Sequence, residues 1–71
     1  MLVHELFTAE KITKDLLAER AEDGTYYETA ANFIIQYWNV EMDDLSPRQV
    51  AWLDKILEDM VEWRIEGRGG K

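Results

Sequence analysis

Apolar residues recur along the chain at helical spacing, in three stretches that glycine or proline separates. Gly24 and Pro47 lie between these stretches, and Gly67 follows the last one. Each stretch is long enough for a helix of several turns. The pattern predicts helices over residues 8–22, 26–41 and 47–66, with approximate ends. Three helices with short connections predict an all-α fold, a small three-helix bundle.

The third predicted helix carries a complete start signal. Ser46 is a natural N-cap, Pro47 suits the first helical position, and Gln49 completes a capping box. Gly67 stands where a helix commonly ends. We therefore expect residues 1–66 to form a single helical domain and residues 67–71 to form a flexible C-terminal tail.

The starts of the other two helices rest on similar side chains. Thr25, with Glu28 three residues later, predicts the cap of the second helix. Thr8 is the predicted cap of the first helix, and Phe7 and Ile12 have the spacing of a hydrophobic staple. The segment before Thr8 is left open: it extends the first helix, forms a separate turn or lies across the bundle.

The aromatic residues suggest two kinds of interface. Trp52 and Trp63 are eleven residues apart in the third helix, so they point the same way about 16 Å apart. They either cover the core or form an exposed aromatic edge that anchors a partner. The second helix is apolar around more than half of its circumference, and its Tyr26, Tyr27 and Trp38 are candidates for a homodimer interface or for partly exposed rings.

Acidic residues outnumber basic ones by fifteen to eight, which gives a net charge of −7. This balance argues against direct binding of a nucleic-acid backbone, for which Lys and Arg supply most of the affinity. Four acidic residues follow one ridge of the third helix at four-residue spacing: Asp54, Glu58, Glu62 and Glu66. Such a ridge is either a solvated face or a row of carboxylates that mimics phosphates and occupies a basic groove.

Residues for catalysis, cofactors or metals are not recognisable in the chain. There is no cysteine, and His4 is the single histidine, without a second base or a nucleophile in a known arrangement. No glycine-rich phosphate loop precedes a helix. We therefore expect no enzyme activity, no cofactor and no metal ion. No apolar run has the length of a membrane span, and the first residues lack a signal-peptide pattern, so a cytoplasmic protein is expected.

Part of the chain resembles a helical module of small bacteriophage proteins. The segment Phe33-Ile34-Ile35-Gln36-Tyr37 is followed by a Leu-Ser-x-x-Gln start from Leu45 to Gln49 and a Trp-Leu-x-x-Ile helix from Trp52 to Ile56. In size and charge the chain is similar to anti-defence inhibitors of phages, including anti-CRISPR proteins. The resemblance implies phage origin and a host target, and it assigns no binding residues.

The leading hypothesis is a non-enzymatic inhibitor that blocks a host nucleic-acid-processing or CRISPR effector complex. Its partner is a larger protein or ribonucleoprotein with a basic groove. The candidate binding residues are acidic or aromatic: Tyr27, Glu41, Asp43, Asp44, Trp52, Asp54, Glu58, Glu62 and Trp63. The alternative hypothesis is a homodimeric structural or accessory module that self-associates through the second helix.

Overall fold

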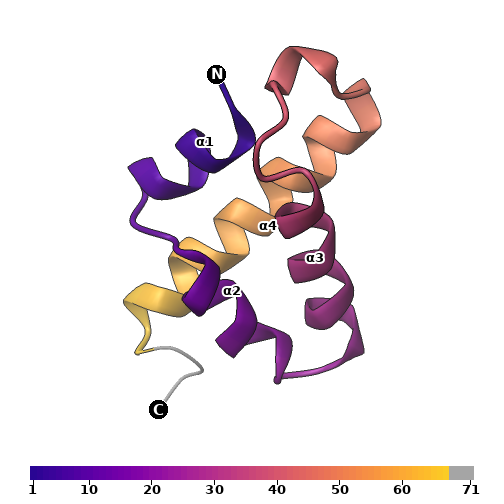
Figure 1. Ribbon diagram of the computed structural model, residues 1–71. Coiled ribbons are helices and arrows are strands. Elements are labelled where there is room, and N and C mark those ends of the chain that lie inside the picture. Colours follow the sequence, from indigo (N-terminus) through magenta and orange to yellow (C-terminus); the bar gives the residue numbers. More distant parts are fainter. Residues whose placement is uncertain (68–71) are drawn as a thin grey trace.

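The computed structural model describes residues 1–67, which form four α-helices and one short 3-10 helix. The elements are α1 (Val3–Ala9), α2 (Lys14–Ala21), α3 (Thr25–Gln36), η1 (Met42–Asp44) and α4 (Pro47–Ile65). The long helix α4 runs diagonally through the view, with α1 on one side of it and α3 on the other (Figure 1). The all-α class is confirmed, but the count of three helices is wrong within the described residues. The predicted C-terminal tail comprises residues 67–71, of which residues 68–71 lie outside the described part of the chain.

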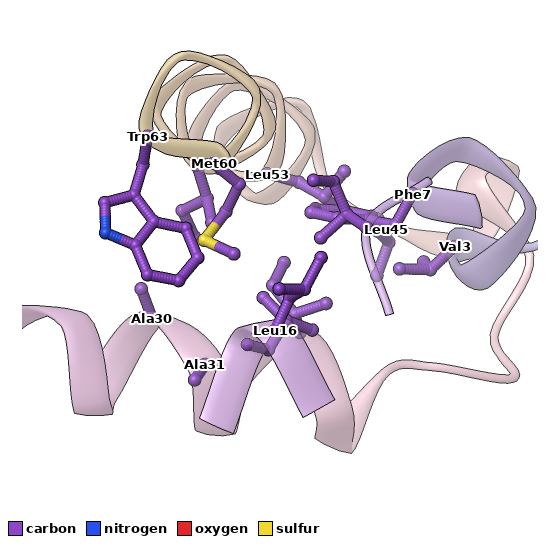
Figure 2. Packing of buried hydrophobic residues seen from close by; sticks show 13 residues of the cluster. Val3, Phe7, Leu16, Ala30, Ala31, Leu45, Leu53, Met60 and Trp63 are labelled. Carbon is purple, nitrogen blue, oxygen red and sulfur yellow. The ribbon is translucent and has the colours of Figure 1, made fainter. Parts of the chain in front are cut away.

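The core draws apolar side chains from every α-helix, and no polar or charged residue is buried among residues 1–67. Met60 and Trp63 point from α4 toward Ala30 and Ala31 of α3 (Figure 2). The small alanine side chains let neighbouring elements approach α3 closely, because interhelical distance depends on the side chains at the contact. α2 and α3, which follow one another in the chain, also pack close together.

The predicted first helix is divided in two by a turn at Lys11, which has a φ of 62°. The Ile12 amide donates to the Phe7 carbonyl at 2.9 Å, and the Lys11 amide donates to the Thr8 carbonyl at 2.9 Å. This pair of bonds is a Schellman motif, which ends a helix with a left-handed residue. Phe7 and Ile12 are both 0% exposed. The two residues thus pack at the end of α1, whereas the sequence predicted a staple at the start of a helix.

The predicted cap at Thr8 is therefore wrong. Thr8 lies inside α1, where its hydroxyl donates to the His4 carbonyl at 2.7 Å. The residue that caps the next helix is Thr13, whose side-chain oxygen accepts a hydrogen bond from the Leu16 amide at 3.2 Å. A threonine N-cap satisfies one of the free amides in the first turn of a helix.

The second predicted helix ends at Gln36 and not at Glu41, because the following segment pairs with the N-terminus. The Val3 amide donates to the Val40 carbonyl at 2.9 Å, and the His4 amide donates to the Trp38 carbonyl at 3.0 Å. These two carbonyls thus satisfy amides in the first turn of α1 that lack intrahelical partners. An antiparallel bridge between Leu2 and Glu41 extends the pairing.

The start of α3 also differs from the prediction. Gly24 is the N-cap, with a φ of 154°, and Thr25 is the first helical residue. No side chain caps this helix, so the predicted capping box between Thr25 and Glu28 does not form. The backbone at Gly24 has a conformation that L-residues rarely adopt, which explains the glycine at this position.

The start of α4 is confirmed in detail. The Gln49 amide donates to the Ser46 hydroxyl oxygen at 3.2 Å, and the Ser46 amide donates to the Gln49 side-chain oxygen at 2.9 Å. Pro47 occupies the first turn. The helix ends at Ile65, and Gly67 follows with a φ of 90°. Both ends of α4 therefore follow from local side-chain and backbone preferences.

The left-handed conformation of Lys11 predicts opposite effects of two glycine substitutions. Lys11→Gly removes a backbone strain of about 1–2 kcal/mol but adds chain entropy to the unfolded state, so we expect stabilisation of up to about 1 kcal/mol. Ala18→Gly, at an exposed interior position of α2, is expected to destabilise by about 1 kcal/mol. Urea denaturation of both variants measures the difference. A loss of stability in Lys11→Gly equal to that in Ala18→Gly would contradict the assigned turn.

Candidate functional site

The outward side of α4 carries a row of acidic residues, Asp54, Glu58 and Glu62, which we call the acidic row. All three are exposed. Successive members are four residues apart, so they lie on one side of the helix at intervals of about 6 Å. Within residues 1–67, none of the three carboxylates takes part in a hydrogen bond or an ion pair. Three of the four residues of the predicted ridge thus form free negative charge on the helix surface, and the fourth, Glu66, is the C-cap residue that follows α4.

A second row, of apolar residues, runs beside the acidic row. Leu57, Val61 and Ile65 each follow an acidic residue by three positions, so the rows are neighbours on the helix surface. We call this set the apolar row. Leu57 and Val61 are partly buried against the core, whereas Ile65 is 72% exposed. The three-residue offset between the two rows is visible in the sequence, but the sequence interpretation did not use it.

The other predicted acidic residues lie before α4. The Met1 amino group donates to Glu41 Oε1 at 2.8 Å, and this hydrogen bond raises the pKa of the amino group above its ordinary value. Asp43 and Asp44 are exposed in η1. Asp54 lies about two turns, or about 10 Å, along α4 from its start. Glu41 is thus engaged in the fold, and the two aspartates of η1 occupy a different stretch from the acidic row.

The two predicted tryptophan anchors have different environments. Trp63 is 5% exposed and belongs to the core, so it is not part of an exposed aromatic edge. Its indole Nε1 is buried and has no hydrogen-bond partner within the described residues. Trp52 is half-buried and stacks on Phe33, with 4.5 Å between the ring centres. Its Nε1 donates to the Tyr26 hydroxyl at 3.4 Å. Only Trp52 thus retains surface access.

Tyr27 is covered by Arg20, a residue that the sequence interpretation missed. The Arg20 guanidinium carbon lies 3.8 Å from the centre of the Tyr27 ring and 5.4 Å from that of Trp63. Its Nε and Nη2 donate to the two carboxylate oxygens of Asp59 at 3.2 and 3.0 Å, and its Nη1 donates to Asp23 at 2.9 Å. Arg20 therefore joins α2, α3 and α4, and its ring contact occupies one face of Tyr27.

The charge of Arg20 is stabilised despite partial burial. The side chain is 15% exposed. Burial lowers the pKa of the guanidinium, but the hydrogen bonds to Asp59 and Asp23 outweigh it, so the pKa is raised above its ordinary value. No short-range sequence signal identifies the pair with Asp59, because the two residues are 39 positions apart.

The residues proposed for a dimer interface are divided among different surroundings. Trp38 packs near α1, with its ring centre 5.8 Å from that of His4, and Lys14 Nζ lies 5.6 Å from the Trp38 ring centre. Tyr26 is 51% exposed, and Ile35 of the same helix, which was not among the proposed residues, is 37% exposed. Because they are nine residues apart, they lie on opposite sides of α3. The helix therefore presents these two exposed side chains in different directions.

Residues 1–67 were also compared with the requirements of a metal site and of a membrane span, and they meet neither. No group of three or more His, Cys, Asp or Glu side chains is arranged to hold a metal ion. None of the helices in the described part has the length and apolar character to cross a membrane. Comparisons of the chain with protein-family models, curated proteins and solved structures found no match.

Substitution of Arg20 tests its role as the joint between the helices. Arg20→Met keeps an apolar stem but leaves Asp59 without its partner, and we expect a loss of about 2 kcal/mol in the free energy of unfolding. Arg48→Met, at an exposed position of α4, is the matched control and should change stability by less than about 0.5 kcal/mol. Urea denaturation measures both variants. Equal stability of the two variants would refute the role of Arg20 in joining the helices.

Substitution of Trp63 distinguishes a core residue from a surface anchor. Trp63→Ala is expected to destabilise the fold by about 3–5 kcal/mol, because it removes a large buried side chain. Trp63→Phe keeps a ring and removes the unpaired indole N–H, so its loss should be below about 1.5 kcal/mol. Thermal unfolding followed by near-UV circular dichroism provides the measurement. A Trp63→Ala protein as stable as the parent would contradict the core assignment.

Proposed function

We propose that this protein is a non-enzymatic binding protein that inhibits a larger nucleic-acid-processing assembly. The acidic row of α4 occupies a basic groove of that assembly and blocks its substrate. The observation that carries the proposal is the geometry of Asp54, Glu58 and Glu62, three exposed carboxylates without partners in the described residues, held in line by a regular helix.

Electrostatics supports a basic target. A net charge of −7 attracts a positively charged surface and speeds encounter with it. The carboxylates repeat about every 6 Å along α4, compared with one phosphate per about 3.4 Å along a nucleic-acid strand. The acidic row therefore offers about half the charge density of a strand. Asp43 and Asp44 in η1 add negative charge beyond the start of the helix.

The target class is narrowed by the resemblance of residues 33–56 to a phage module. A phage protein of this character would act on a host complex that threatens the phage genome, and a CRISPR effector is the foremost candidate. Lys and Arg side chains that hold nucleic-acid phosphates in such a complex would meet carboxylates instead. Trp52, half-buried at the Phe33 stack, would add aromatic contact near the charged surface.

Charge reversal in the acidic row tests this function. The tagged protein is used to capture partners from a nuclease-treated bacterial lysate at about 0.15 M salt, with identification by mass spectrometry. We expect capture of a nuclease, polymerase or CRISPR subunit, and a loss of about tenfold or more for Glu58→Lys combined with Glu62→Lys, because two attractive contacts become repulsive. Glu10→Lys combined with Glu22→Lys is the control, since it changes the net charge equally at exposed positions elsewhere.

The outcomes separate the hypotheses. Capture that survives reversal of Glu58 and Glu62 would refute the mimicry of nucleic acid. Capture that both double variants lose equally would assign it to net charge and not to the acidic row. Recovery of the bait alone, with a mass near twice 8.4 kDa in solution, would favour the self-associating module.

A further inference from the structure

The acidic row and the apolar row together form a two-sided surface on one helix. The rows extend from Asp54 to Ile65, which is about three turns or about 17 Å of α4. Ile65 is the most exposed large apolar side chain among residues 1–67. It continues the line of Leu57 and Val61 at four-residue spacing, and therefore extends a partly buried apolar row into solvent.

We propose that this surface docks an amphipathic helix of the partner that carries Lys or Arg along one side and aliphatic residues along the other. The inference rests on the proposed function and specifies the partner's chemistry. The basic side of the docked helix pairs with the acidic row, while its aliphatic side covers Ile65 and the edges of Leu57 and Val61. Helices recognise one another in this way through residues at three- and four-residue spacing.

Charge complementarity selects this occupant over the other candidates. A second copy of the chain in the same position would place two acidic rows against each other, which like-charge repulsion disfavours. A nucleic-acid strand has the same sign of charge as the row. A purely apolar helix would bury the free carboxylates of Glu58 and Glu62 without partners, at a high desolvation cost. A basic amphipathic helix pairs its charges with the acidic row and covers the apolar row at the same time.

The direct test uses a defined probe. A fluorescein-labelled 18-residue peptide of leucine and lysine, with leucines at helical spacing, is titrated with the full chain at about 0.15 M salt, and binding is followed by fluorescence anisotropy. A peptide of the same composition in scrambled order, without an apolar side, is the probe control. We expect the amphipathic peptide to bind at least about tenfold more tightly than the scrambled one, because only it matches both rows.

Variants of each row assign the binding to this surface. Ile65→Ser is expected to weaken binding about fivefold to tenfold, because it removes an exposed aliphatic contact. Ile35→Ser, which alters an exposed isoleucine of α3, should bind like the parent. Glu58→Lys with Glu62→Lys should weaken binding by about tenfold or more, whereas Glu10→Lys with Glu22→Lys should have a much smaller effect. Denaturation midpoints of all variants confirm that each one folds.

Failure of this inference differs from failure of the proposed function. If Ile65→Ser binds as the parent does while the reversal at Glu58 and Glu62 weakens binding, the surface acts through charge alone and the docked helix is refuted. Equal binding of the two peptides refutes it as well. If the reversal in the acidic row changes neither peptide binding nor capture from lysate, the proposed function fails together with the inference.

Discussion

The orientation of α4 depends on the contact between Arg20 and Asp59. The Arg20 guanidinium donates to both oxygens of the Asp59 carboxylate and also lies against the Tyr27 ring. One side chain of α2 thus contacts both α3 and α4. Two parallel hydrogen bonds to a carboxylate constrain direction as well as distance. Glu58 lies about 100° around the helix from Asp59. The inner side of α4 is buried in the core through Leu53, Ile56, Met60 and Trp63. The contact of Asp59 with Arg20 acts together with this buried side to keep Glu58 in solvent.

Backbone pairing provides the second constraint, at the other end of the molecule. α1 has seven residues, a length at which an isolated helix is marginal in water. Carbonyls of Trp38 and Val40 accept hydrogen bonds from its first amides, and the Met42 amide donates to the Met1 carbonyl at 2.8 Å. The helix is thereby stabilised by a segment about forty residues away in the chain. The same bonds stop α3 from continuing, because they hold the carbonyls of this segment in a different direction.

The sequence predicted correctly those features that depend on neighbouring residues. The capping box at Ser46 and Gln49 needs no distant partner, and it is present. Phe7 and Ile12 were correctly paired but assigned to the wrong end of a helix, since a staple and a Schellman motif both use a spacing of five residues. The end of α1 at Lys11 was not recognised in the sequence, because glycine is the usual residue at a left-handed helix end. The contacts of Arg20 and the early end of α3 depend on residues far apart in the chain, so local patterns contained no signal for them.

The candidate site is separable from the stability of the fold. The acidic row contributes no contact to the core, and its like-charge neighbours at four-residue spacing cost about 0.2–0.5 kcal/mol for each pair. The capping box, worth about 1 kcal/mol, offsets this cost within the same helix. Trp63 shows the opposite case. The sequence left open whether it covers the core or anchors a partner, and the structure buries it, so its removal affects folding first. A loss of binding on substitution of Glu58 or Glu62 therefore reports on the surface itself. Within residues 1–67 neither carboxylate takes part in a hydrogen bond or an ion pair, whereas Arg20, Asp59 and Trp63 hold α4 in place.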